Sequence, residues 1–352
     1  MFRKKRITMS ASMLIGALAL VSCGSVASSS EDQNATDGTQ TTESWEAPDG
    51  LSGEISYYSA NPQGLTDDLV AAFEEKTDVK VNVYADTTGK ITARLKAEEA
   101  NPQADLVYMA SWDAATEQSS AGTLAPYTPE GSDQVHEGWA TEEFVGRDGS
   151  ALALVVNTNA TDATPSDWAD LTDPEYKDQV IMPDPRESGT AADLITAMVA
   201  HQGKQETWKL FDGLFENGMV VQGANGPALD TVTAGSKAVV FGGVDYSAYS
   251  ARDEGEALEV IIPDSGTTVT PRPLMIMESS DNAQAAEAFA DFMFSAEGQE
   301  VSAQRNMIPG REDVATQAGP QFEEIDQLAT DWDEIVESSE GVTDEFVERY
   351  LD

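Results

Sequence analysis

The sequence predicts an α/β protein of two lobes joined by crossing strands, and two observations lead to this prediction. Short apolar strands alternate with amphipathic helices, which is the order expected of a parallel sheet covered on both faces. This alternation of strands and helices occurs once before residue 150 and again after it, and two further extended segments connect the two parts. About 300 residues carry the pattern, enough for two lobes of ordinary size.

The N-terminus has the pattern of a secretory signal. Four basic residues lie within the first six positions, and an apolar run follows from Met9 to Val21. A spanning helix needs about 20 apolar residues, so this run is too short. It ends at Leu20-Val21-Ser22-Cys23, which resembles the bacterial lipobox and so implies removal of residues 1–22 and acylation of Cys23. An ordinary signal with an incidental cysteine is the alternative.

Cys23 is the only cysteine in the sequence, so we expect neither a disulfide nor a thiol nucleophile in the mature protein. Residues 23–53 are rich in Ser, Thr, Asp, Glu, Asn and Gly and nearly lack aliphatic side chains, which predicts a flexible tether. The folded part is therefore expected outside the cytoplasm, held by lipid to the outer face of the cell membrane or in the periplasm.

The formal net charge is -43, from 20 basic and 63 acidic residues. Such a field repels nucleic acid and anionic lipid headgroups, so neither is an expected partner.

The expected first lobe contains three strands that alternate with helices. The strands show apolar residues at alternate positions or in short runs, and the helices show them on one face. Trp112 begins a further helix, and we expect it in the core rather than stacked on a solute. The expected strands are 54–58, 79–84 and 104–109, and the expected helices are 65–76 and 87–100.

The alternation continues with strand 179–182, a helix from 188 to about 201 and strand 238–244. Residues 151–157 and 267–277 are the expected crossings. A strongly amphipathic helix is expected over 282–299, and the tail is expected to be helical around 322–328. This division assigns residues 54–150 and 264–352 to lobe 1 and residues 151–263 to lobe 2.

The sequence offers no support for catalysis. Its histidines are His136, expected in a polar loop, and His201, expected to close a helix, where it would interact with the helix dipole. No Cys or His cluster has metal-ligand spacing, and no nucleophile elbow, Walker loop or dinucleotide fingerprint is present. We therefore expect neither a cofactor nor enzymatic activity, with an exported hydrolase as the rival interpretation.

Small polar loops precede several expected helices. A helix N-terminus exposes unpaired N–H groups and a partial positive charge, so Ser, Thr and Gly there can bind an anion. Ligands of open α/β sheets bind outside the carboxyl ends of the strands, where these loops would lie. Each loop by itself would also serve as an ordinary helix cap. The loops are 61–64, 87–89, 188–190 and 225–226.

Three segments resemble extracellular solute-binding proteins of ABC importers, with a family 1-like pattern: residues 93–106, 183–191 and 286–299. The similarity spans about residues 55–308 and is strongest to the branch with ferric-iron, 2-aminoethylphosphonate and hexose-phosphate binders. The resemblance implies the type II periplasmic-binding fold, with two lobes, a two-strand hinge and closure around a small solute. It also implies an ABC permease as partner, and we expect the binding protein to be a monomer.

The resemblance leaves the solute open. Ferric binders of this group use adjacent tyrosines, whereas Tyr246 and Tyr249 are three residues apart. The Thr-Gly and Ser-Gly-Thr loops are similar to those of phosphonate and sugar-phosphate relatives, so an oxyanion is the preferred solute. The acidic composition instead suits ferric iron or a polyamine, and both stay as alternatives.

The expected binding residues divide by role. Asp245 would pair with an amine, and Tyr246 would close over the solute or, with Asp245, bind ferric iron. Arg272 is the one cation near the expected hinge and would contact the solute or form an ion pair. The expected donors to the anion are Thr87, Thr88, Gly89, Ser188, Gly189 and Thr190, and the residues expected to contact the rest of the solute are Asn61, Gln63, Asn225 and Gly226.

Overall fold

The structure, a computed structural model, describes residues 44–329, 331–332, 335 and 341–351. The expected signal, the expected lipidation site at Cys23 and most of the expected tether lie outside these residues. The strands are β1 (Ser52–Ser59), β2 (Asp78–Ala85), β3 (Leu106–Tyr108), β4 (Phe144–Asn157), β5 (Val180–Met182), β6 (Val220–Val221), β7 (Val239–Val244), β8 (Leu258–Ile261), β9 (Val269–Ile276) and β10 (Ile308–Pro309).

The helices alternate with these strands along most of the chain. Short 3-10 turns lie at Ser132–Gln134, Trp168–Thr172, Pro174–Tyr176 and Phe322–Glu324. The α-helices are α1 (Gln63–Lys76), α2 (Thr88–Ala97), α3 (Trp112–Ser120), α4 (Gly189–Glu216), α5 (Asn225–Thr233), α6 (Asp245–Asp253), α7 (Ala283–Phe294), α8 (Ala296–Gln304) and α10 (Val342–Tyr350). None of the helices in the described part of the chain has the length and apolar character needed to span a membrane.

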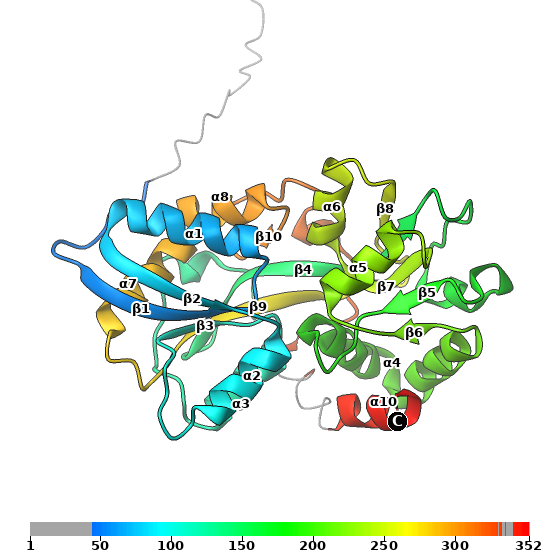
Figure 1. Cartoon of the computed structure of the whole chain (residues 1–352), viewed down its shortest axis with the longest axis horizontal. Coiled ribbons are helices and arrows are strands. Elements are labelled where there is room, and N and C mark those ends of the chain that lie inside the picture. Colours follow the sequence, from blue (N-terminus) through cyan, green and yellow to red (C-terminus); the bar gives the residue numbers. More distant parts are fainter. Residues whose placement is uncertain (1–43, 330, 333–334, 336–340, 352) are drawn as a thin grey trace, which may run out of the picture. The chain divides into compact units, whose positions relative to one another are not determined.

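The strands form one mixed sheet in the order β2-β1-β3-β9-β4-β7-β5-β6, with β8 and β10 also paired to β4. Pairing is parallel at both ends of this order, within β2-β1-β3 and within β7-β5-β6. It is antiparallel in the middle, where β9 pairs with β3 and β4. Figure 1 shows β4 and β9 running between the two groups of strands, as expected for two crossing segments.

The crossing is longer than the sequence predicted, because β4 begins at Phe144 rather than at residue 151. All its residues are buried, including the charged pair Arg147 and Asp148. A Cβ atom added to Gly149 would lie 2.5 Å from the Trp139 ring, so glycine lets β4 pass close to that ring.

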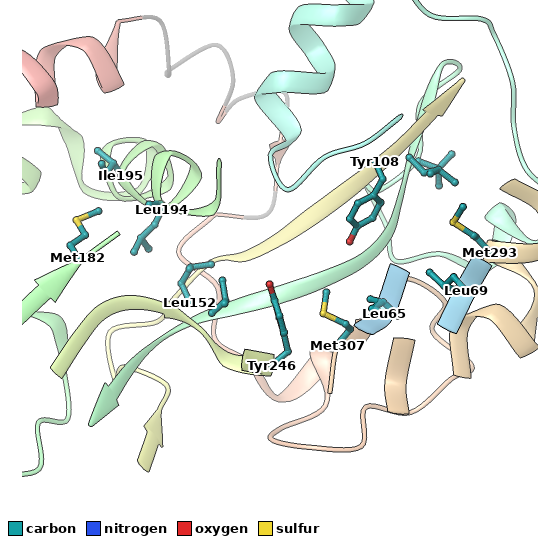
Figure 2. Packing of buried hydrophobic residues seen from close by; sticks show 14 of the residues in the cluster. Leu65, Leu69, Tyr108, Leu152, Met182, Leu194, Ile195, Tyr246, Met293 and Met307 are labelled. Carbon is teal, nitrogen blue, oxygen red and sulfur yellow. The ribbon is translucent and has the colours of Figure 1, made fainter. Parts of the chain in front are cut away.

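Helices cover both faces of the sheet. On the β2-β1-β3 side, α1 and α7 pack on one face through residues such as Leu65 and Phe289, and α2 and α3 pack on the other through Ile91 and Trp112. On the β7-β5-β6 side, α4 packs on one face and α5 and α6 on the other. Leu152 and Leu194 lie together in Figure 2, at the point where α4 meets the crossing strands.

Two helix predictions were wrong, and a third was close to the structure. α4 continues to Glu216, but its backbone leaves the helical conformation at Gly203, which has φ 82°, so the helix end expected near His201 corresponds to this break. The single helix expected over 282–299 is broken at Ser295, whose hydroxyl caps α8. Where a helix was expected over 322–328, the described chain has a short 3-10 turn at Phe322–Glu324, and α10 follows later in the tail.

The C-terminal helix α10 packs on α4. Phe346 is fully buried against Phe211, with ring centroids 5.0 Å apart, and Tyr350 stacks on Phe215 at 4.5 Å. Lys204 of α4 forms an ion pair with Glu345 at 3.1 Å. The helix is therefore tied to the β7-β5-β6 side of the sheet.

Candidate functional site

A cavity of about 390 Å³ lies where several strands end and helices begin. It draws loops from both sides of the crossing strands, as expected for a ligand site in an open α/β fold. Most of the expected site residues line it: Asn61, Gln63, Thr87, Thr88, Ser188, Gly189, Asn225, Gly226, Tyr246 and Arg272. The exceptions are Gly89, Thr190 and Asp245.

On one wall of the cavity, the first turns of α4 and α5 are joined by a hydrogen-bonded triad. The hydroxyl of Ser188 donates to Oδ1 of Asn225 at 3.0 Å and accepts from the amide of Ala191. Nδ2 of Asn225 donates to the hydroxyl of Thr190, also at 3.0 Å. Thr190 is fully buried, so its role here is to hold the loop.

The opposite wall is built from the loops that begin α1 and α2. The hydroxyl of Thr88 accepts from the amide of Ala110 at 3.1 Å, and Nδ2 of Asn61 donates to the hydroxyl of Tyr57 at 3.3 Å. Two buried polar atoms on this wall lack a hydrogen-bond partner within the described residues, namely Oδ1 of Asn61 and Oγ1 of Thr87. A buried polar atom without a partner costs free energy, so both atoms can gain from a bound solute.

Besides α4, which Ser188 caps, three helices begin at a residue that lines the cavity. Gln63 begins α1, Thr88 begins α2 and Asn225 begins α5, and all three residues line it. Within the part of the chain that the structure describes, no side chain caps these first turns. Their amide N–H groups and helix dipoles therefore favour an anion in the cavity.

Arg272 of β9 reaches the cavity from the crossing strands. The side chain is 1% exposed, and Nη2 donates to the carbonyl oxygen of Ala60 at 3.0 Å. Nε and Nη1 have no hydrogen-bond partner among the described residues. Burial lowers the pKa of Arg272, but Tyr108, Tyr246 and Asp148 raise it, and the net direction is upward. The guanidinium therefore stays charged.

Arg272 belongs to a buried network around one carboxylate. Asp148 lies opposite Arg272 in the β4–β9 register, and its Oδ1 is 3.8 Å from Nε of Arg272. Arg147 is paired with the same carboxylate and donates to the hydroxyl of Ser302 at 2.6 Å. Burial raises the pKa of Tyr108, which stays neutral. Two guanidinium groups thus face one carboxylate, and the network holds an excess positive charge.

Asp245 supplies only part of the missing negative charge. Its carboxylate accepts from the amide of Tyr246 at 2.8 Å at the start of α6, and the side chain is 2% exposed. Burial raises the pKa of Asp245 to about 7, although backbone N–H groups and Arg272 lower it. Near neutral pH the group is therefore only partly ionised.

The two tyrosines of α6 have different surroundings. Tyr246 lines the cavity, and its ring centroid is 5.3 Å from the guanidinium carbon of Arg272. Tyr108 lies at the same distance from that carbon, and Figure 2 shows the hydroxyl groups of both tyrosines directed toward the crossing strands. Tyr249 is buried beside Gly319 and does not belong to the cavity lining.

The mouth of the cavity carries carboxylates that the sequence analysis did not single out. Asp86 accepts from the amide of Thr87 and forms an ion pair with Lys90 at 2.9 Å, and Glu187 lies on the other wall. Within the described residues, no group of three or more His, Cys, Asp and Glu side chains could hold a metal ion. The cavity is thus cationic at its floor and acidic at its rim.

Sequence reasoning also missed Tyr108, Arg147 and Asp148. The glycines that flank Arg147 and Asp148 are typical of a turn, and nothing local indicates that both charges are buried in a strand. The pairing of Asp148 with Arg272 is a contact between distant segments, so no local pattern could have indicated it.

The histidines are structural. His136 lies in a loop, as expected, but it is buried there and stacks on Phe322 with ring centroids 3.8 Å apart. His201 lies just before the helix break at Gly203, as expected for a residue near a helix end, and its Nδ1 contacts the carbonyl oxygen of Leu328 at 2.6 Å. Trp112 is 2% exposed, packs on Phe144 and does not line the cavity, as expected for a core residue.

Comparison with known proteins places these features in a family. Residues 101–338 match the bacterial extracellular solute-binding proteins. A Haemophilus influenzae protein without an assigned function is 26% identical over 265 residues, which are 71% of this chain and 75% of that protein. A probable ABC transporter periplasmic-binding protein of Sinorhizobium fredii is 25% identical over 225 residues, 59% of this chain and 61% of that protein.

Solved structures agree with the fold. The periplasmic binding protein AfuA from Actinobacillus pleuropneumoniae, with fructose-6-phosphate bound, has a TM-score of 0.77 at 22% identity, covering 85% of this chain and 99% of AfuA. Iron-bound HitA from Pseudomonas aeruginosa has a TM-score of 0.73 at 21% identity, covering 83% and 98%. These similarities confirm the two-lobed type II periplasmic-binding fold and span relatives with different solutes.

Proposed function

Because the chain belongs to the family of bacterial extracellular solute-binding proteins, we propose that it captures a small oxyanionic solute for an ABC importer. The solute would bind in the cavity between the lobes and pass to a membrane permease. The observation that supports an anion is Arg272, a buried guanidinium at the cavity with two nitrogen atoms that lack hydrogen-bond partners in the described chain.

Electrostatics supports this choice. A buried charge is costly unless it is paired, and Asp148 already faces Arg147 as well as Arg272. A phosphate, phosphonate or similar group at Arg272 would supply the missing negative charge and accept from Nε and Nη1. The uncapped first turns of α1, α2 and α5 would donate to its other oxygens.

The rest of the solute should be able to donate hydrogen bonds. Oδ1 of Asn61 is a buried acceptor without a partner in the described chain, and the rim carries Asp86 and Glu187. Hydroxyl groups of a sugar phosphate or the ammonium group of an aminoalkylphosphonate would suit these acceptors. Either ligand would place its anionic end at the floor of the cavity and its donors toward the mouth.

Ferric iron suits the cavity less well. Fe(III) favours several phenolate and carboxylate oxygens, but Tyr249 points elsewhere and the carboxylate of Asp245 is buried with backbone partners. The Arg272 guanidinium, 5.3 Å from the Tyr246 ring, would also repel the ion. A polyamine would meet the same cation at the floor.

The experiment is a thermal-shift panel on the mature chain with hexose phosphates, 2-aminoethylphosphonate, ferric salts and polyamines. A ligand at 100 times its dissociation constant should stabilise the protein by about 2.7 kcal/mol. We expect this shift with a phosphorylated or phosphonate compound. A shift with iron or a polyamine alone would overturn the oxyanion proposal, and turnover of a phosphoester would support the rival hydrolase.

Paired variants test the role of Arg272. Arg272→Met removes the charge at the cavity and should abolish the shift caused by the anion. Arg252→Met removes an exposed charge of α6 that lies over the Tyr249 ring, away from the cavity, and should retain it. Equal ligand shifts in both variants would contradict the proposed contact.

We also propose the lipid anchor at Cys23 and a monomeric state, as expected from the sequence. For the lobes, we keep residues 54–150 and 151–263 as the bodies of lobes 1 and 2, with the segment from residue 264 returning to lobe 1. The exception is α10, which we assign to lobe 2 because Phe346 packs on α4.

A further inference from the structure

The two lobes touch each other directly beside the cavity. Ser111, the N-cap of α3 in lobe 1, donates its hydroxyl to Oδ1 of Asp193 in α4 of lobe 2 at 2.9 Å. The amide of Trp112 lies 3.4 Å from the other carboxylate oxygen. Asp193 is 3% exposed, so this contact excludes water and the lobes are closed here.

Two glycines lie in close contact with the opposite lobe. A Cβ atom added to Gly89 of α2 would lie 2.4 Å from the carbonyl oxygen of Arg186. One added to Gly189 of α4 would lie 2.7 Å from both the carbonyl oxygen of Ala110 and Cβ of Ser111. Contacts this short do not occur for real Cβ atoms, and two of these three partners are backbone atoms that cannot rotate away.

The backbone conformation does not explain these glycines. Neither has the positive φ that would itself require glycine, and both lie in first turns of helices, where alanine is the better helix former. The need for glycine therefore comes from the opposite lobe.

We propose that Gly89 and Gly189 determine closure of the cleft, because their missing side chains let the lobes meet backbone to backbone. Ser111 and Asp193 form the polar part of the same contact. We call these four residues the interlobe clasp. The contact is made by protein groups alone. The lobes can therefore meet without a solute between these residues, and an added methyl group at either glycine holds the lobes apart.

This inference rests on the proposed capture function in one respect: opening of the clasp would weaken solute binding. Closure itself can be measured without solute. If the ligand panel fails, the clasp can still be tested, and if the clasp fails, the anion site can still be tested.

The test measures the distance between the lobes by pulsed electron spin resonance. In a mature chain carrying Cys23→Ser, spin labels are attached through Ala97→Cys at the end of α2 and Asp230→Cys in α5, both exposed positions. Without solute, we expect the parent chain to show a short-distance population that represents the closed form.

Gly89→Ala and Gly189→Ala should each lower the ratio of closed to open molecules at least about tenfold, equal to about 1.4 kcal/mol. Gly226→Ala is the matched control. It adds the same methyl group in the first turn of α5, where nothing in the part of the chain that the structure describes lies within 4 Å. We expect the control to keep the parent distribution.

Circular dichroism and melting curves check that the variants are folded. A parent chain with only the long distance would overturn the proposal. So would a parent-like distribution in either clasp variant, or an equal loss of the closed form in Gly226→Ala, which would make the effect unspecific.

Discussion

The hydroxyl group of Tyr108, at the end of β3, donates a 2.5 Å hydrogen bond to Oδ1 of Asp148 in the middle of β4. This bond joins the first group of strands to the crossing strand at a carboxylate that also faces Arg147 and Arg272. Asp148 therefore joins the buried arginines beside the candidate solute site.

Asp148→Asn should destabilise the protein strongly. The change removes the carboxylate that two buried guanidinium groups share. Loss of one partner from a buried pair costs about 3–5 kcal/mol. Chemical denaturation in the absence of solute measures the effect. A bound oxyanion should restore part of the loss, and a change below about 1 kcal/mol would show that the arginines are not dependent on this carboxylate.

Tyr246→Phe and Tyr249→Phe should separate the two tyrosines of α6. Tyr246 lines the cavity beside Arg272, whereas Tyr249 packs beside Gly319. We expect calorimetry to show weaker binding of the solute identified by the panel in Tyr246→Phe, by about three- to tenfold if one hydrogen bond is lost. Tyr249→Phe should bind like the parent, and the opposite ranking would contradict the placement of the cavity.

Asp245 should make stability depend on pH. Burial raises the pKa of this carboxyl to about 7 in the folded chain, well above the value near 3.9 expected when unfolded. The stability that protonated Asp245 contributes is fully present below the pKa of this group in the unfolded chain. It is lost as the pH rises through the folded-state pKa of about 7. Asp245→Asn cannot ionise and keeps a carbonyl oxygen for the amide of Tyr246.

The variant should therefore gain stability relative to the parent by on the order of 2 kcal/mol between pH 5 and pH 7. Urea unfolding of both chains at pH 5, 6 and 7 measures this difference. An offset that stays constant across the range would mean that the pKa of Asp245 is not raised in the folded chain.

Phe346→Ala should release α10 from α4. Phe346 is 0% exposed to solvent and packs on Phe211. Truncation of such a buried side chain to alanine costs about 3–5 kcal/mol of stability. Limited proteolysis should then cut near the C-terminus. Glu348→Ala, at an exposed position of the same helix, is the control and should resist cleavage like the parent.

Cys23→Ser should release the protein from the membrane without changing solute affinity. Fractionation and metabolic labelling with a fatty acid would show whether Cys23 carries lipid. A tether of about 30 residues has a root-mean-square reach of roughly 30 Å, so the anchored protein would stay near a permease in the same membrane. Continued membrane association of the variant would argue for a different anchor.

The α/β class, the helix-start loops and most strands could be predicted from the sequence, because they depend on local periodicity and turn chemistry. The Ser188 and Thr88 loops could be identified for the same reason, since polar residues before a helix are visible along the chain. The burial and the partners of charged residues could not be predicted in this way. Arg147 and Asp148 look like a turn between glycines, yet two of their partners, Ser302 and Arg272, lie more than 100 residues away.

The sequence by itself determined that this is a two-lobed α/β protein with polar loops at its helix starts, and its resemblance indicated solute capture. Only the tertiary structure decided which loops share a cavity and that the buried charge of Arg272 is not fully balanced by carboxylates. It also showed that Gly89 and Gly189 face the opposite lobe. The physical reason is that burial, charge balance and close backbone approach depend on segments that are distant along the chain.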